Sequence, residues 1–189
     1  MKNIIEQSFL EISDLLRNSA SLSNAIEKVI TQITRAIKNG NKIVLFGNGG
    51  SAADAQHIAA EFVGRFMLER ESYPAIALTT DSSVITSLGN DYSYDIVFSR
   101  QCESLVTKGD VVIGISTSGN SKNVEKGINT AKQKGAITIG LLGNDGGTII
   151  NNVDFSIVVN SNSTPRIQEA HRVIYHIICD LVEQNLSKK

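Results

Sequence analysis

Several residue types that mark specialised protein classes are scarce in this chain of 189 residues. Its only two cysteines, Cys102 and Cys179, lie far apart in the sequence, which excludes a disulfide framework and a cysteine-based zinc site. We expect both thiols to be buried or idle. Only 2 prolines accompany 15 glycines, a composition typical of regular elements joined by glycine turns rather than of a linker.

The chain also lacks an excess of one charge and any long apolar run. Its 18 basic and 19 acidic residues give a formal net charge of −1, which argues against non-specific nucleic-acid binding. No run approaches the ~18 apolar residues of a membrane span, and the N-terminus lacks the apolar core of a secretory signal. We therefore expect a soluble cytoplasmic protein. Its length and 41% hydrophobic content suit one domain with its own core.

What the chain does contain is an alternation of apolar runs and helical periodicity. Residues 1–39 are predicted to form two helices, the second capped by Ser21 or Ser23 and ended by Asn39-Gly40. Strands are expected at 42–46, 75–78, 111–115, 136–142 and 155–159, and further helices at 52–68, 123–134 and 166–186. Apolar strands that alternate with helices predict an α/β fold with a doubly wound, five-stranded parallel sheet flanked by helices. We expect the N-terminal helical pair to pack outside this sheet or against a partner subunit.

Two loops follow strands at the sheet edge where such folds bind ligands. The first, at 47–51, is rich in glycine and opens a helix, so it suits either an anion or a tight strand–helix turn. It matches neither a Walker loop nor a dinucleotide fingerprint. The second, at 116–121, places four hydroxyls around Gly119. One hydroxyl is enough for a helix cap, so four favour a phosphate cup.

Two helices carry polar groups that could perform chemistry. His57 and Glu61 are four residues apart and share a helix face, as a metal-ligand pair, an acid–base pair or a solvated ion pair would. The last helix carries Gln168, His171 and His176. Gln168 and His176 lie about 80° apart on one broad face. The pattern alone leaves open which of these histidines is functional.

These blocks together resemble the phosphoheptose isomerases, a branch of the sugar isomerase (SIS) domain proteins. The SIS-like block is Ser116-Thr117-Ser118-Gly119-Asn120-Ser121. The branch-specific blocks are Gly47-Asn48-Gly49-Gly50-Ser51 with Asp54 and His57, then Gly89-Asn90-Asp91, then Arg166-Ile167-Gln168-Glu169. The resemblance covers nearly the whole chain. It implies one SIS domain over 1–189, with 1–39 as an N-terminal helical oligomerisation segment.

The resemblance also implies roles for individual residues. One zinc ion per subunit would be held by His57, Glu61, Gln168 and His176, with Glu61 as the catalytic base and His176 as its acid–base partner. The substrate-binding residues would be Asn48, Gly49, Gly50, Ser51, Glu61, Asn90, Asp91, Ser116, Thr117, Ser118, Ser121 and Gln168. The chain departs from some relatives at Pro165, where they carry an acidic residue near the site.

The implied reaction converts sedoheptulose 7-phosphate to D-glycero-D-manno-heptose 7-phosphate by proton transfer through an enediol. Its product would feed the synthesis of nucleotide-activated heptose for lipopolysaccharide or capsule. The implied assembly is a homotetramer with sites at subunit interfaces, and no nucleic acid or membrane partner is expected. One alternative is an SIS isomerase for another phosphosugar. The other is a non-enzymatic SIS protein that senses phosphosugars or binds a replication initiator, which has no need to keep His57, Glu61, Gln168 and His176 together.

Overall fold

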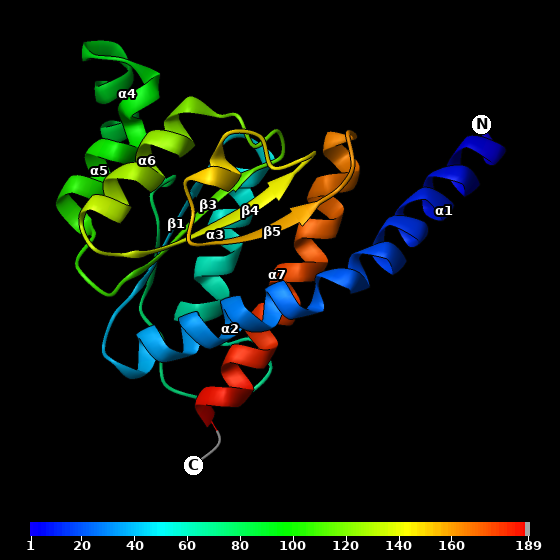
Figure 1. Cartoon of the computed structure of the whole chain (residues 1–189), viewed down its shortest axis with the longest axis horizontal. Helices are drawn as coiled ribbons and strands as arrows, with labels where there is room; N and C mark the ends of the chain where they lie inside the picture. The colour runs from blue at the N-terminus through cyan, green and yellow to red at the C-terminus, as the bar shows by residue number, and fades with distance from the viewer. Residues whose placement is uncertain (188–189) are drawn as a thin grey trace.

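A single parallel sheet of five strands forms the centre of the computed structural model, which describes residues 1–187 (Figure 1). The strands are β1 (Ile43–Gly47), β2 (Ala75–Ala77), β3 (Val111–Ser116), β4 (Ile137–Gly143) and β5 (Phe155–Val159). Their order is β2-β1-β3-β4-β5, and every neighbouring pair is parallel. The predicted five-stranded parallel sheet is confirmed.

Helices cover both faces of this sheet. They are α1 (Lys2–Ser19), α2 (Ser23–Lys38), α3 (Gly50–Val63), α4 (Ser82–Asp91), α5 (Val97–Leu105), α6 (Lys122–Gln133) and α7 (Thr164–Ser187). Ile43 and Leu45 of β1 pack into the apolar layer formed with α2, α3 and α7. Val44 and Phe46 point the other way and pack with α5 and α6. Because the central strands are buried on both faces, β1, β3 and β4 carry runs of successive apolar residues rather than alternate ones.

Several boundaries differ from those expected. The segment 79–110 contains α4 and α5, which were not predicted, and α3 ends at Val63 rather than near residue 68. The expected serine cap of α2 is wrong. Ser21 and Ser23 donate instead to backbone carbonyls of the preceding helical turn, and the chain stays helical between α1 and α2. Among residues 1–187, no helix combines the length and apolar character that crossing a bilayer requires.

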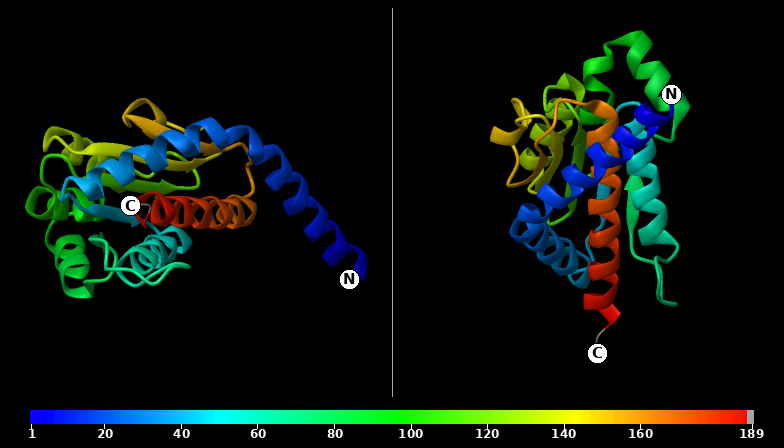
Figure 2. Two further views of the ribbon diagram at one scale, coloured as in Figure 1. Left: turned by 90° about the horizontal axis from the view of Figure 1, so that it is seen from below. Right: turned by 90° about the vertical axis from the view of Figure 1, so that its right-hand side faces the viewer.

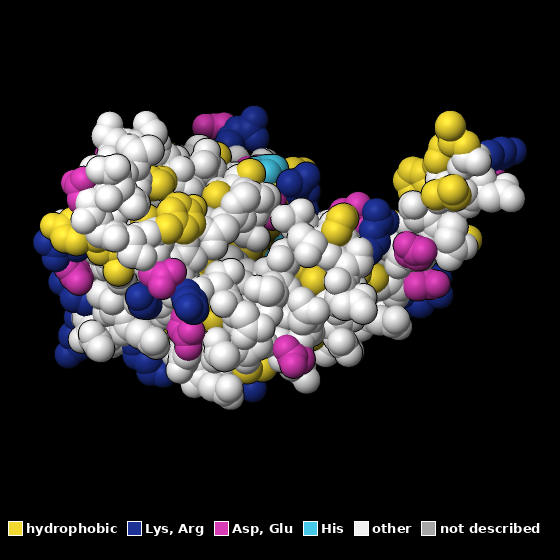
Figure 3. Space-filling model, turned by 90° about the horizontal axis from the view of Figure 1, so that it is seen from above, with side chains coloured by type: hydrophobic (Ala, Val, Ile, Leu, Met, Phe, Trp, Pro, Cys, Tyr) yellow, Lys and Arg dark blue, Asp and Glu magenta, His cyan; other side chains and the backbone are white. Residues whose placement is uncertain are grey.

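The two N-terminal helices pack differently. Helix α2 buries residues such as Val29 and Ile33 in the layer that also contains α7. Every residue of α1 is at least partly exposed, and α1 extends from the body as an arm (Figure 2). Apolar side chains are concentrated toward the free end of this arm (Figure 3), where Ile4, Ile5 and Phe9 are exposed. The helical pair is therefore present as predicted, but only α2 belongs to the core.

The topology places both predicted ligand loops at one edge of the sheet. Strand β1 leads into α3 on one face, and its neighbour β3 leads into α6 on the other face. The carboxyl ends of these two strands form the switch point at which doubly wound sheets bind their ligands. The loops 47–51 and 116–121 begin at these two strand ends.

Candidate active site

The serine-rich loop after β3 gathers its hydroxyls into one cup. Ser116 Oγ lies 3.0 Å from Ser121 Oγ and 3.4 Å from Ser118 Oγ. Ser116 is buried, and its hydroxyl also accepts a hydrogen bond from the backbone N–H of Gly119 at 3.1 Å. Gly119 has φ +67° and lies so close to Gly146 that a Cβ would come within 2.2 Å of its backbone. The glycine is therefore needed for the tight path of the loop.

The cup lies at the N-terminus of α6. Ser121 occupies the cap position, yet within residues 1–187 its side chain makes no capping hydrogen bond to the helix. Its hydroxyl thus remains directed at Ser116, and Asn123 Oδ1 accepts instead from the N–H of Val124 in the first turn of α6 at 2.9 Å. A cluster of hydroxyl donors at a helix N-terminus suits a phosphate group. The structure therefore favours the phosphate cup over a simple serine cap.

The glycine-rich loop after β1 is tied to the second loop by side-chain amides. Asn48 and Asn123 exchange two hydrogen bonds of 2.9 Å each, and the Tyr94 hydroxyl donates to Asn48 Oδ1 at 3.3 Å. Gly50 begins α3, and a Cβ there would lie 2.2 Å from Nε2 of Gln168. The absence of a side chain at Gly50 thus lets α7 approach the first turn of α3.

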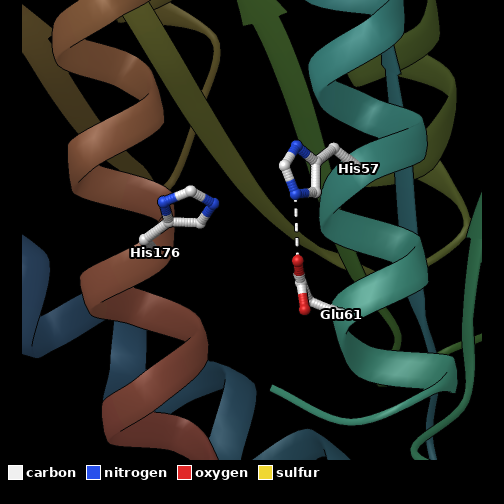
Figure 4. A group of neighbouring side chains, drawn as sticks. All are labelled: His57, Glu61 and His176. Atoms are coloured by element: carbon white, nitrogen blue, oxygen red, sulfur yellow. Dashed lines mark hydrogen bonds and ion pairs between the residues drawn. The ribbon is translucent and has the colours of Figure 1, made fainter. Parts of the chain in front are cut away.

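Farther along the same two helices, three potential metal ligands come together. His57 and Glu61 project from α3, and His176 projects toward them from α7 (Figure 4). One ligand atom from each lies within 4.8 Å of the other two. His57 Nε2 is 2.9 Å from Glu61 Oε1, and the two side chains are 41% and 21% exposed. The group is therefore sheltered but open to a small ligand.

The other ring nitrogen of His57, Nδ1, is contacted by Tyr175. The Tyr175 hydroxyl lies 3.1 Å from His57 Nδ1 and 3.3 Å from Asp54 Oδ1. Arg172 also contacts both Tyr175 and Asp54, each at 3.1 Å. Burial is the main factor that raises the pKa of Tyr175 to about 12, so its hydroxyl stays protonated at neutral pH. Tyr175, itself held by Asp54 and Arg172, thus orients the His57 ring.

The two histidines of α7 have distinct environments. Burial, assisted by the neighbouring His57, lowers the pKa of His176 below its ordinary value, which keeps the ring neutral at neutral pH. A neutral imidazole can accept a proton or bind a metal. His171 is fully buried, its Nε2 lies 2.9 Å from the carbonyl of Leu142, and burial lowers its pKa too. His171 is thus a core residue of α7.

The two helices that carry this group are joined at their far ends by a buried ion pair. Glu183 of α7 accepts hydrogen bonds from the backbone N–H groups of residues 66–68 and from Arg70 Nε at 2.7 Å. Arg70 in turn donates to the carbonyls of Glu61 and Phe62 at the end of α3. This cap explains why α3 stops at Val63.

The remaining predicted residues fall into two groups. Ser51 is buried in the first turn of α3, and Gln168 lies against Gly50, toward the N-terminal ends of the helices that carry the His57 group. Asn90 and Asp91 are exposed at the end of α4, where Asn90 donates to Asp91 at 2.8 Å. The membership of Gln168, Asn90 and Asp91 in the active site therefore stays a prediction.

Some residues that shape the site were missed in the sequence. They are Tyr94, Asn123, Tyr175, Arg172 and Arg70. Tyr175 lies next to His176 in the sequence, but nothing in its spacing distinguishes it from a core aromatic residue. Asp54 was noted only as part of the motif around the first loop. Each acts through a contact with a residue at least 8 positions away, such as the 118 positions between His57 and Tyr175.

Comparisons with known proteins agree with this arrangement. The SIS domain family model matches residues 9–143. The curated phosphoheptose isomerase of Geobacter metallireducens is 52% identical over 186 residues, which cover 94% of this chain and 98% of the relative.

Two solved structures are similar over nearly their whole length. The phosphoheptose isomerase of Neisseria gonorrhoeae has a TM-score of 0.92 and 38% identity, and the match covers 97% of this chain and 98% of that one. A phosphoheptose isomerase from Francisella tularensis has a TM-score of 0.93 and 32% identity over 96% and 97% of the two chains. Given these matches in sequence and in fold, this chain belongs to the phosphoheptose isomerases of the SIS domain family.

Proposed function

We propose that this chain converts sedoheptulose 7-phosphate to D-glycero-D-manno-heptose 7-phosphate, and that the His57, Glu61 and His176 group performs the proton transfers. The observation that carries the proposal is the convergence of these three side chains in a phosphoheptose isomerase whose serine cup is intact. A protein that only binds phosphosugars or a replication initiator has no need to keep this group together.

The substrate has its phosphate at one end and its reacting carbons, C1 and C2, at the other. The hydroxyls of Ser116, Thr117, Ser118 and Ser121, with the N-terminus of α6, would hold the phosphate. His57 follows Gly50 by roughly two turns of α3, so the proton-transfer group is displaced from the loops along the helix. Asn48, Gly49, Gly50, Ser51, Asn90 and Asp91 would contact the sugar chain between these two ends.

In the proposed mechanism, Glu61 takes a proton from C1 and later returns it to C2. Neutral His176 accepts the proton of the O1 hydroxyl and delivers it to O2, so that an enediolate with its charge on O1 forms between C1 and C2. When Glu61 returns its proton to C2, the electrons on O1 form the C1–O1 double bond, which leaves the aldehyde of the product. Proton transfer by two positioned side chains contributes about 10²–10⁴-fold each in typical enzymes.

The donor set fits a metal ion. Two imidazole nitrogens and a carboxylate within 4.8 Å, with the Gln168 amide as a fourth candidate, suit zinc. Bound zinc would supply a Lewis acid that polarises a substrate oxygen. Coordination makes a carboxylate less basic, so Glu61 must be loosely held or free when it takes the proton from C1.

We further propose that residues 1–189 form one SIS domain that assembles as a homotetramer through 1–39, with sites at subunit interfaces. The exposed apolar residues of α1 support this, as does an apolar groove between α1, α2 and α7 with Val173, Ile177 and Leu181 on its wall. We expect the reaction in the cytoplasm, where the buried free thiols of Cys102 and Cys179 would stay reduced.

The test is to incubate the protein and zinc with sedoheptulose 7-phosphate in D₂O and to follow the sugar by NMR. We expect an aldoheptose 7-phosphate that carries deuterium at C2, because the proton on Glu61 exchanges with solvent. No new sugar and no exchange would overturn the proposal. Turnover of a different phosphosugar alone would identify another SIS isomerase.

A further inference from the structure

Tyr175 contacts the nitrogen of His57 that faces away from Glu61. Its hydroxyl lies 3.1 Å from His57 Nδ1, while His57 Nε2 lies 2.9 Å from Glu61. Tyr175 is 1% exposed, so water does not compete for this hydroxyl. Which nitrogen of His57 carries the proton therefore depends on the other partners of the Tyr175 hydroxyl.

The donors and acceptors around this hydroxyl determine which nitrogen of His57 is protonated. A tyrosine hydroxyl has one proton to donate and accepts with its lone pairs. Arg172 Nε donates to it at 3.1 Å, which occupies one lone pair. The hydroxyl proton goes to Asp54 Oδ1 at 3.3 Å, since a carboxylate is a stronger acceptor than an imidazole nitrogen. The remaining lone pair faces His57 Nδ1, which must then be the donor.

The opposite arrangement would be costly. If the Tyr175 hydroxyl donated to His57 Nδ1, Asp54 would lose one of the two donors to its Oδ1 atom. Asp54 is 1% exposed, and within residues 1–187 its Oδ2 atom already has no hydrogen-bond partner. A buried carboxylate that loses a donor bears a desolvation cost that nothing else repays.

We propose that Tyr175, held by Asp54 and Arg172, is a positioning residue that keeps the proton of His57 on Nδ1. His57 Nε2 then directs its lone pair toward Glu61, whose Oε1 atom is 2.9 Å away, and toward His176, so that these acceptors need a cation or a second proton between them. Ligating histidines commonly have such a partner on the second nitrogen, and its removal typically costs 10–100-fold in metal affinity or activity. The inference rests on the proposed role of His57 as a metal ligand.

The first experiment observes the proton directly. The chain has only 3 histidines, so ¹⁵N labelling of histidine gives a spectrum simple enough to assign with His→Gln variants. In the metal-free wild-type protein we expect a proton on His57 Nδ1. In Tyr175→Phe we expect it on Nε2, where Glu61 can accept it. An unprotonated Nδ1 in the wild type, or an Nδ1 that stays protonated in Tyr175→Phe, would overturn the proposal.

The second experiment measures zinc affinity by competition with a chelator. We expect Tyr175→Phe to bind zinc about 10–100-fold more weakly. The matched control is Tyr73→Phe, which removes a hydroxyl from a partly buried tyrosine whose ring packs against Arg70, and should leave zinc affinity unchanged. Equal zinc affinity in Tyr175→Phe and Tyr73→Phe would contradict the proposal.

A second variant covers the case in which Tyr175→Phe folds poorly. Asp54→Asn leaves Tyr175 in place but weakens the acceptor that draws its proton away from His57. We expect zinc binding weakened in the same direction and by less, with kcat at limiting zinc reduced and KM for the sugar phosphate little changed. Failure of the wild type to isomerise sedoheptulose 7-phosphate would overturn the proposed reaction only, because the NMR and zinc measurements need no substrate.

Discussion

At the scale of single residues, the site depends on the contacts that each side chain makes. Glu61 and His176 are separated by 115 positions, yet their ligand atoms lie within 4.8 Å of each other. His176 is neutral because burial and a neighbouring imidazole disfavour its charged form. A carboxylate and a neutral imidazole that face the same space can move a carbon-bound and an oxygen-bound proton in one turnover.

The first prediction concerns the proposed base. Glu61→Gln should lower kcat by about 10²–10⁴-fold, since an amide cannot take a proton from C1. Binding of the sugar phosphate should largely persist, because the serine cup is untouched. Steady-state kinetics with sedoheptulose 7-phosphate and zinc in excess will measure the kcat, and a binding titration will measure the affinity.

The contrast variant is Ser121→Ala, which removes one hydroxyl of the cup. It should mainly raise KM, because it weakens a contact made in both the ground state and the transition state. Unchanged turnover in Glu61→Gln would refute the base assignment. An unchanged KM in Ser121→Ala would refute the cup.

At the scale of elements, α3 and α7 must stay aligned for the group to persist. They are joined at their far ends by Glu183 and Arg70, whose side chains are only 1% and 6% exposed. Arg70 also caps α3, since it donates to the carbonyl of Glu61 at 2.8 Å. Breaking this ion pair would therefore disturb both the fold and the end of α3 that carries the base.

The second prediction is that Glu183→Gln destabilises the protein by about 3–5 kcal/mol, as the loss of one partner leaves the other charge buried and unpaired. Denaturant unfolding followed by circular dichroism will measure the loss. Glu103→Gln is the matched control, because Glu103 pairs with Arg100 on the exposed surface, where such pairs contribute about 0–1 kcal/mol. Equal losses in the two variants would contradict the prediction.

The same ion pair predicts a dependence on pH. Burial alone would raise the pKa of Glu183, but three backbone N–H groups and Arg70 outweigh it and hold the pKa below its ordinary value. The stabilisation is thus complete above the unfolded-state pKa of about 4.3 and is lost as the pH falls through the lower, folded-state pKa. The unfolding free energy should therefore decline less below pH 4 in Glu183→Gln than in the wild type.

At the scale of the whole molecule, the arm formed by α1 is the feature that a monomer does not explain. Apolar residues make up a continuous face of this helix, yet Ile4 is 72% exposed and Phe9 is 71% exposed. The free end of α1 extends well beyond the body in the left view of Figure 2. An apolar face of this kind is stabilised when another copy of the chain covers it.

The third prediction is that the double variant Ile5→Asp and Phe9→Asp assembles into smaller oligomers than the wild type, because it places two charges in the apolar face. Light scattering after size-exclusion chromatography will give the mass of each. Gln7→Asp is the control, since it adds a charge to an exposed polar position on the same helix. A monomeric wild type, or a double variant of unchanged mass, would contradict the prediction.

The sequence by itself determined the elements whose local pattern is strong. Fully apolar runs such as 111–115 identified the strands, because only burial on both faces favours such a run. The helices in the segment 79–110 could not be predicted in the same way. No residue of α4 is buried, so its short apolar face gives only a weak signal in the sequence, and the cap at Asp81, which accepts from Val84 N at 2.9 Å, marks its start.

The sequence also identified His57, Glu61 and His176 as candidates, and a spacing of four residues places the first two on one face of a helix. The residue pattern alone left open whether His171 or His176 joins them, and in the tertiary structure it is His176, because that choice depends on how α7 is rotated against α3 and the sheet. The same holds for Tyr175, Asp54 and Arg70, whose partners lie on other elements. Local pattern follows from short-range sterics and burial, whereas the site arises from contacts between distant segments that exist only once the helices have packed.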